Sequence, residues 1–175
     1  FAFVGDSTFF ASAITGVVNA VYNQANMVLI VLDNSTTAMT GHQPHPGTGR
    51  TVMGEIVQKI NIEQVLRGIG VTEIETINPL ELEASVSCVK RMAEKSGVRA
   101  IIFKAPCIAV TKPKAPLHVN QDSCIGCKKC IRDLGCPAIV MNDGKICIDA
   151  SMCTGCHLCS QVCPVCAIAG GDDHE

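Results

Sequence analysis

The sequence contains few aromatic residues and no long apolar segment. Aromatic residues make up 3% of its 175 residues, and tryptophan is absent. The longest apolar run, Met27–Leu32, has the length of a strand and falls far short of the roughly 18 residues that a membrane-spanning helix needs. A basic segment followed by an apolar stretch, as in a secretory signal peptide, is also missing. We therefore expect a cytoplasmic protein with no membrane partner.

An excess of charge of either sign is lacking too. The formal net charge at pH 7 is −2, and charged residues make up 17% of the chain. Binding to nucleic acid or to an anionic surface usually needs a clear excess of Lys and Arg. The charge balance therefore predicts no nucleic-acid partner. Hydrophobic residues, at 47%, are abundant enough for a buried core.

Cysteine, by contrast, is abundant and unevenly placed. Ten of the twelve cysteines lie between Cys124 and Cys166. A secreted domain held together by disulfides is small and lacks a long, apolar, cysteine-poor region. Such a region precedes the cysteines here. The distribution favours a reducing compartment in which the thiolates bind metal.

The first two-thirds of the chain have the pattern of an α/β domain. Strand-like segments at 1–4, 27–32, 71–77 and 98–104 alternate with helix-like segments at 8–23, 61–68 and 78–96. Asn78 is the predicted N-cap of the last helix, with Pro79 at its first position. This alternation predicts a parallel sheet. Phe1 is not Met and already begins a strand, so we expect the start of this domain to be absent.

A segment rich in Pro and Lys, 111–120, separates two different compositions and is the predicted linker. We predict a partial α/β parallel-sheet domain over 1–112 and a small α+β domain over 117–175. The second domain contains an internal repeat, because residues 119–124 correspond to residues 148–153 at an offset of 29.

This repeat has the cysteine spacing of a bacterial two-cluster ferredoxin. Each copy reads Cys-x2-Cys-x2-Cys and ends in Cys-Pro, after three further residues in the second copy and five in the first. In two-cluster ferredoxins the Cys-Pro cysteine of each copy ligates the cluster of the other copy. We therefore predict a ferredoxin-like domain with two [4Fe–4S] clusters, one on Cys124, Cys127, Cys130 and Cys163, and one on Cys153, Cys156, Cys159 and Cys136.

Zinc and disulfides are the alternative uses of these cysteines. Two zinc sites would need paired Cys-x2-Cys knuckles rather than triplets followed by Cys-Pro. The four cysteines outside the pattern are predicted to be small, buried, apolar residues. They are Cys88, Cys107, Cys147 and Cys166.

Polar residues follow two neighbouring strands of the predicted sheet. Gly5-Asp6-Ser7 ends the first strand, and Asp33-Asn34 ends the second. Ligands of parallel sheets bind at the carboxyl ends of strands, where carboxylate and amide oxygens can hold a hard divalent cation. The same residues also serve in turns and helix caps, so that simpler role stays open.

Gly5-Asp6-Ser7 followed by Asn34 resembles the thiamine diphosphate motif. By this resemblance Asp6, Asn34 and the carbonyl of Thr36 bind Mg²⁺, which holds the diphosphate of the cofactor. Gly5 and Ser7 belong to the same cofactor-binding motif.

The stretch TTAMTGHQPHPG, which begins at Thr36, resembles the α subunit of the indolepyruvate:ferredoxin oxidoreductase family. That family has a thiamine domain followed by a two-cluster ferredoxin domain, and the resemblance spans essentially the whole chain. It implies oxidative decarboxylation of arylpyruvates with coenzyme A to aryl-acetyl-CoA and CO2. It also implies electron transfer through both clusters to external ferredoxin, and a β subunit as partner.

By the same resemblance, the glutamate that activates the thiamine ring belongs to a domain outside this sequence. The catalytic residue is therefore unknown, and we expect the isolated chain not to turn over.

Two other functions remain as alternatives. One is a related subunit that acts on pyruvate or 2-oxoglutarate, although TGHQPHPG differs from the TGGQ-like loop of such relatives. The other is an iron–sulfur electron carrier without enzymatic activity. His42 and His45 have a spacing that suits a metal or proton transfer. Because Pro44 and Pro46 already indicate a rigid loop, we favour a surface or substrate-lining loop in which neither histidine titrates.

Overall fold

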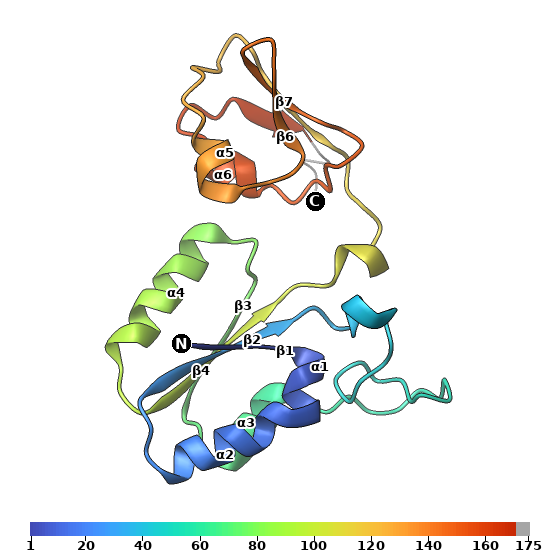
Figure 1. Ribbon diagram of the computed structural model, residues 1–175, viewed down its shortest axis with the longest axis vertical. Coiled ribbons are helices and arrows are strands. Elements are labelled where there is room, and N and C mark those ends of the chain that lie inside the picture. Colours follow the sequence, from blue (N-terminus) through green and yellow to red (C-terminus); the bar gives the residue numbers. More distant parts are fainter. Residues whose placement is uncertain (171–175) are drawn as a thin grey trace. The chain divides into compact units, whose positions relative to one another are not determined.

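The computed structural model describes residues 1–170, and its chain divides into two units (Figure 1). The first unit is Phe1–Thr111, and the second begins at Lys112. The last five residues of the predicted second domain, 171–175, lie outside the described residues. Each unit has its own sheets.

A four-stranded parallel sheet forms the centre of the first unit. Its strands follow the order β1-β2-β4-β3, and every neighbouring pair is parallel. The predicted α/β parallel sheet is therefore confirmed. β2 and β4 occupy the middle and are almost wholly apolar, as strands covered on both faces must be. The strands are β1 (Ala2–Gly5), β2 (Met27–Asp33), β3 (Glu73–Ile77) and β4 (Val98–Lys104).

The first helical stretch begins directly at the end of β1. It runs through α1 (Asp6–Thr8), a π-helical turn η1 (Phe9–Ala13) and α2 (Ile14–Tyr22). The helix predicted from residue 8 thus starts earlier, so Asp6 lies in its first turn. π-Helical turns are rare and occur often at functional sites.

Two further helices complete the first unit. The side chain of Asn61 caps α3 (Ile62–Ile69) by accepting a hydrogen bond from the Gln64 amide at 3.1 Å. The expected start of α4 was wrong: it begins at Leu82 and runs to Glu94. Asn78 instead forms a local turn, because its side-chain oxygen accepts from the Leu80 amide at 3.0 Å. Such Asx turns compete with helix formation.

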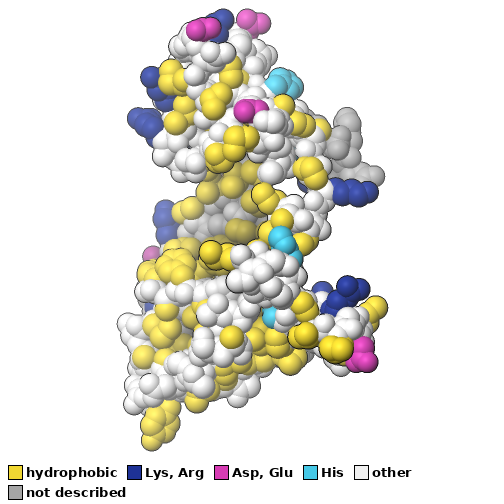
Figure 2. Space-filling view, turned by 45° about the vertical axis from the view of Figure 1, so that its right-hand side comes forward, with side chains coloured by type: hydrophobic (Ala, Val, Ile, Leu, Met, Phe, Trp, Pro, Cys, Tyr) yellow, Lys and Arg dark blue, Asp and Glu magenta, His cyan; other side chains and the backbone are white. Residues whose placement is uncertain are grey.

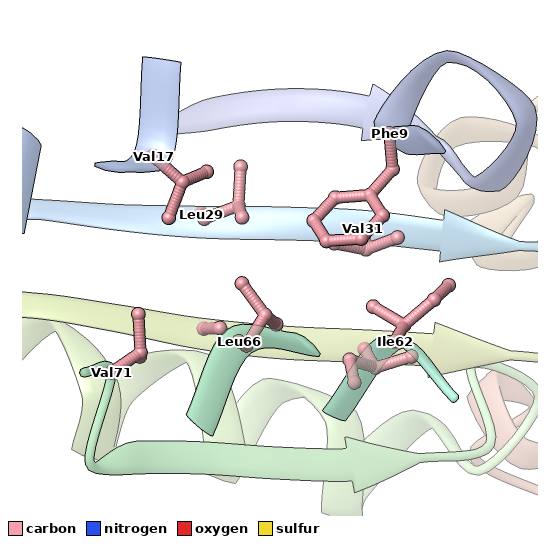
Figure 3. Close-up of a cluster of buried hydrophobic side chains, with 9 residues drawn as sticks. Phe9, Val17, Leu29, Val31, Ile62, Leu66 and Val71 are labelled. Atoms are coloured by element: carbon pink, nitrogen blue, oxygen red, sulfur yellow. The ribbon is translucent and has the colours of Figure 1, made fainter. Parts of the chain in front are cut away.

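Helices cover both faces of the sheet. Alternate residues of β2 point to opposite sides, so Leu29 and Val31 meet the side of α2 and α3, whereas Val28 and Ile30 meet α4. Figure 3 shows the first of these clusters, in which side chains of the helices point toward β2. Its buried members are Phe9, Val17, Leu29, Val31, Ile62, Leu66, Val71, Ala100 and Ile102.

Long loops follow the carboxyl ends of the strands. One contains the short 3₁₀ helix η2 (Ala38–Thr40) and then projects from the sheet before α3 (Figure 1). Val52, Met53 and Ile56 of this loop are exposed, and Figure 2 shows hydrophobic side chains gathered on a projecting lobe. Another 3₁₀ helix, η3 (Ile108–Val110), follows β4.

Over residues 112–170, the second unit forms two small antiparallel sheets and two short helices. β5 (Leu117–Val119) pairs with β8 (Ile168–Gly170), and β6 (Ile139–Asn142) pairs with β7 (Lys145–Ile148). Asp143 and Gly144 join β6 to β7 with positive φ angles, as two-residue hairpin turns require. The helices are α5 (Lys129–Leu134) and α6 (Leu158–Val162).

The sequence repeat is also a repeat of backbone conformation. Gly126 and Lys128 have φ angles of 65° and 59°, and their counterparts Gly155 and His157 have 67° and 60°. Each middle cysteine, Cys127 or Cys156, therefore lies between two left-handed residues. This tight turn brings the cysteines of one triplet around a common centre.

Among residues 1–170, none of the helices combines the length and the apolar character that crossing a bilayer would take.

Leu66 provides a test of the core of the first unit. Its side chain is fully buried between α3 and the sheet. Leu66→Ala is expected to lower the free energy of unfolding by about 2–5 kcal/mol, because it leaves a cavity. The control Val52→Ala, at a position that is 88% exposed, should change it by less than about 0.5 kcal/mol. Denaturant unfolding followed by circular dichroism measures both, and equal effects would contradict this packing.

Candidate functional site

Asp6 is a buried carboxylate at the carboxyl edge of the sheet. Its residue is 2% exposed. Oδ1 accepts a hydrogen bond from the Ser7 amide at 2.8 Å, and Oδ2 accepts one from the Ser35 amide at 2.8 Å. These bonds join the first helical turn to the loop after β2, although the two segments are far apart in sequence.

The loop after β2 is folded tightly around its polar residues. Ser35 has a φ of 60°, and its amide is shared between Asp6 and Asp33 Oδ1, the latter at 3.0 Å. Asp33 Oδ2 also lies 3.4 Å from the Lys104 ammonium group at the end of β4. Two carboxylates thus converge on one backbone N–H, and a lysine balances one of them.

The other predicted cofactor residues surround this centre. Gly5 precedes the helical stretch in extended conformation, and the Ser7 hydroxyl accepts a hydrogen bond from the Thr37 hydroxyl at 3.0 Å. Thr36 is buried, and its amide donates to Asn34 Oδ1 at 3.2 Å. The structure therefore brings Asp6 and Ser7 into hydrogen-bond contact with the loop 34–37, while the Asn34 side chain turns back onto its own loop.

His45 is part of this site, although the sequence favoured a surface or substrate-lining loop without a titrating role for it. Its side chain is 5% exposed, and Nε2 lies 3.1 Å from Asp6 Oδ2. The ring also lies against Phe10, with centroids 5.7 Å apart. A surface position is therefore wrong for His45, whereas His42 is exposed. The contact joins residues far apart in sequence, so no local pattern could have revealed it.

Burial raises the pKa of the Asp6 carboxyl above its ordinary value. The hydrogen bond from Ser7 and the neighbouring His45 oppose this effect, and the negative charge of Asp33 adds to it. The hydrogen-bond partners described for Asp6 are two backbone amides and an imidazole, none of which is a fixed cation. A divalent cation would compensate the buried charge, so this donor set suits Mg²⁺.

The cysteines of the first predicted set converge on one cavity. Cys124, Cys127, Cys130 and Cys163 all line it, and Cys163 comes from the other copy of the repeat. Burial raises the pKa of the Cys130 thiol, and the charges of Cys127 and Cys163 raise it further. The remaining lining residues are apolar: Val119, Ile125, Ile146, Pro164, Val165, Ala167 and Ile168.

The second set is grouped in the same crossed manner. Burial, and to a smaller extent the charges of Cys156, Cys153 and Cys136, together raise the pKa of Cys159 to about 11. Cys136, from the first copy, is thus an electrostatic neighbour of the second triplet. Thiolates crowded in this way repel one another, and a shared cationic group removes the repulsion. Both sets suit a metal cluster.

Backbone amides also point at two of these sulfur atoms. The Ala167 amide donates to Cys163 Sγ at 3.2 Å, and the Leu117 amide donates to Cys153 Sγ at 3.4 Å. Hydrogen bonds of this kind stabilise negative charge on a thiolate and influence the potential of a bound cluster.

Among residues 1–170, no group of three or more His, Cys, Asp or Glu side chains could hold a metal ion as placed. A single ion needs its ligands within one coordination sphere. Each cysteine of a four-iron cluster instead ligates an iron atom of its own.

The prediction for the four remaining cysteines was only partly right. Cys88 is fully buried, whereas Cys107 and Cys147 are half-buried and Cys166 is exposed. Cys166 has a φ of 50°, in a two-residue insertion after Cys163-Pro164 that the first copy lacks. The predicted burial is therefore wrong for Cys166.

Comparison with known proteins supports the first unit as a cofactor domain. Residues 1–103 match the model of the thiamine pyrophosphate enzyme family, C-terminal TPP binding domain. Thiamine pyrophosphate and thiamine diphosphate are the same compound.

Most of the chain is similar to proteins named indolepyruvate oxidoreductase subunit IorA. It is 44% identical to the protein of Methanothermobacter thermautotrophicus, over 95% of this chain and 27% of that protein. It is 42% identical to that of Methanothermobacter marburgensis, over 95% and 27%, and 40% identical to that of Archaeoglobus fulgidus, over 93% and 27%. The chain spans about a quarter of the length of these curated relatives. Because the family model covers more than half of its residues, the chain belongs to the thiamine pyrophosphate enzymes, and its first unit is their C-terminal TPP-binding domain.

Proposed function

We propose that this chain is part of an oxidoreductase that oxidatively decarboxylates arylpyruvates. Coenzyme A receives the acyl group, so the products are an aryl-acetyl-CoA and CO2, and the electron pair leaves one electron at a time. The observation that carries the proposal is that one chain combines a TPP-binding domain with a unit in which thiols of two cysteine repeats converge. The similarity to the IorA proteins supports the aryl substrate class.

Residues of the first unit bind and orient the cofactor. Asp6 and Asn34, with the carbonyl of Thr36, are the proposed Mg²⁺ ligands, and Gly5 and Ser7 lie along the diphosphate. When bound, thiamine diphosphate supplies the nucleophilic carbon and the electron sink for decarboxylation of a 2-oxoacid. The bonds of Asp6 and Ser7 fix the first helical turn against the loop after β2, so the Asp6 carboxylate is held in place before the cofactor arrives.

Residues of the second unit form the proposed path for electrons. Each cysteine set would hold one [4Fe–4S] cluster, and the crossed ligands tie both copies of the repeat to both clusters. Apart from its cysteines, the first cavity is lined by apolar side chains, which lower the polarity around its sulfur atoms. A two-electron oxidation can thus be divided into single-electron steps that end on an external ferredoxin.

The proposed enzyme needs partners beyond this chain. These are a β subunit, external ferredoxin and coenzyme A. A related enzyme specific for pyruvate or 2-oxoglutarate would use the same residues, and an electron carrier without activity would use only the cysteines.

Substrate selection is tested on the anaerobic complex. With thiamine diphosphate, Mg²⁺ and coenzyme A present, indolepyruvate and phenylpyruvate should reduce a viologen dye rapidly, and omission of coenzyme A should suppress the reaction. Pyruvate and 2-oxoglutarate should be poor substrates. Activity confined to those two would keep the mechanism and reject the aryl class. No activity with any 2-oxoacid, in protein with bound cofactor and full iron content, would reject the enzymatic proposal.

The role of Asp6 is tested by Asp6→Asn. Losing the carboxylate should weaken Mg²⁺-dependent binding of thiamine diphosphate by more than about 100-fold, which exceeds the usual effect of changing a partner of a metal ligand. Calorimetric titration of the complex measures this. The control Glu83→Gln, at an exposed position on α4, should bind as the unchanged protein does. Equal affinity of Asp6→Asn and the control would remove Asp6 from the metal site.

The two exposed cysteines provide a matched test of cluster ligation. Cys127 and Cys166 are both exposed, but only Cys127 is a proposed ligand. In anaerobic, iron-containing protein, iodoacetamide should modify Cys166 and spare Cys127, because an iron-bound thiolate is not free to react. After iron is removed with a chelator, both should react. Peptide mass spectrometry measures the labelling, alongside an expected content of about eight irons per chain. Equal labelling before iron removal would contradict the ligand role of Cys127.

A further inference from the structure

His45 is a buried polar side chain for which the cofactor proposal gives no role. It lies in the loop between η2 and α3, outside the segments that carry the thiamine motif. Its ring is enclosed: the side chain is 5% exposed, Phe10 lies beside it, and Pro44 and Pro46 flank it in sequence. Polar groups are buried at a cost unless their hydrogen bonds are made, so the two ring nitrogens need partners.

Both ring nitrogens have such partners, and these fix the tautomer. The Gly47 amide donates to Nδ1 at 3.1 Å, so Nδ1 must carry a lone pair. The ring proton therefore belongs to Nε2, which donates to Asp6 Oδ2 at 3.1 Å. The contact is a hydrogen bond from the imidazole Nε2–H to the Asp6 carboxylate.

The loop around the ring is fixed on either side. The Thr48 hydroxyl donates to the His45 carbonyl at 2.8 Å, and the Ile60 amide donates to the Pro46 carbonyl at 3.0 Å. Gly47 approaches so closely that a Cβ there would stand 3.0 Å from His45 Cε1 and 3.0 Å from Phe10. The ring thus has little freedom to rotate away from Asp6.

The two oxygens of Asp6 are not equivalent as a result. Oδ2 accepts from both the Ser35 amide and His45, whereas the donor that residues 1–170 direct at Oδ1 is the Ser7 amide. A carboxylate oxygen offers two lone-pair directions. Oδ2 is therefore saturated, and Oδ1 keeps an acceptor direction for a cation.

From this geometry we propose that His45 is a positioning residue for the metal site. By occupying Oδ2 through its Nε2–H, it fixes the carboxylate of Asp6 so that Oδ1 is the oxygen presented to Mg²⁺. It also ties the loop that carries TGHQPHPG to the metal ligand. The inference rests on the proposed role of Asp6 as a ligand.

Two substitutions of His45 distinguish the effect of its hydrogen bond to Asp6 from the effect of its ring packing. In His45→Asn the amide oxygen can still accept from Gly47, but nothing reaches Asp6. In His45→Gln the longer side chain places an N–H near the position of Nε2. Both lose the packing against Phe10, so a purely structural role of the ring would affect them alike.

The measurement is the Mg²⁺ affinity of the intact complex at saturating thiamine diphosphate, by calorimetric titration, together with the unfolding temperature without metal. His45→Asn should weaken Mg²⁺ binding by about 10–100-fold, as is usual when a partner of a metal ligand is removed. His45→Gln should stay closer to the unchanged protein. The control His42→Asn, at an exposed position with a φ of 62° that Asn tolerates, should leave the affinity unchanged.

Gly47→Ala reaches the same contact without altering His45. The added methyl group displaces the ring, so Gly47→Ala alone should lower the Mg²⁺ affinity. Adding Gly47→Ala to the His45→Asn variant should not lower that affinity any further. This variant decides the question if His45→Asn does not fold.

Asp6→Asn distinguishes failure of this inference from failure of the proposed function. If Asp6→Asn binds Mg²⁺ normally, the proposed metal site is wrong. If Asp6→Asn loses binding while His45→Asn and His45→Gln bind equally, or while Gly47→Ala has no effect, the positioning role alone is overturned.

Discussion

Burial of the Asp6 carboxylate is the constraint on which the first unit's site depends. A buried carboxylate must find hydrogen-bond donors, and its described donors come from three separate segments: the helical turn at Ser7, the loop at Ser35 and the loop at His45. The hydrogen bonds to this one carboxylate therefore hold together the three segments that lie at the carboxyl ends of β1 and β2. The same burial raises the pKa of Asp6, which makes the site one where a cation is favourable.

A related constraint organises the second unit. Thiols crowded in an apolar environment resist ionisation, as the pKa of about 11 for Cys159 illustrates. The repeat places left-handed residues on both sides of Cys127 and of Cys156, and each triplet is then joined by a cysteine of the other copy. Clusters bound there would hold the unit together as well as carry electrons, because so short a unit has little core of its own.

Several features followed from local sequence alone. The apolar run of β2 indicated a strand, and the alternation of strands and helices predicted a parallel sheet, in which strands are covered on both faces. The cysteine spacing predicted crossed ligation of two clusters; this stays a prediction, supported by the position of Cys163 at the cavity of the first triplet. Two predictions from local sequence were wrong. Asn78 was predicted to cap α4 but forms a turn before it. Cys166 was predicted to be buried, but its thiol is exposed and its residue has a left-handed conformation.

The sequence by itself thus determined which residue types lie at the strand ends of the first unit and how the cysteines of the second are spaced, because both are local signals. Only the tertiary structure decided that His45 lies on Asp6, that Asp33 shares the Ser35 amide with it, and that Lys104 balances Asp33. These contacts join segments separated by tens of residues. They depend on the order of strands in the sheet and on the path of a long loop, and neither is encoded in a local pattern.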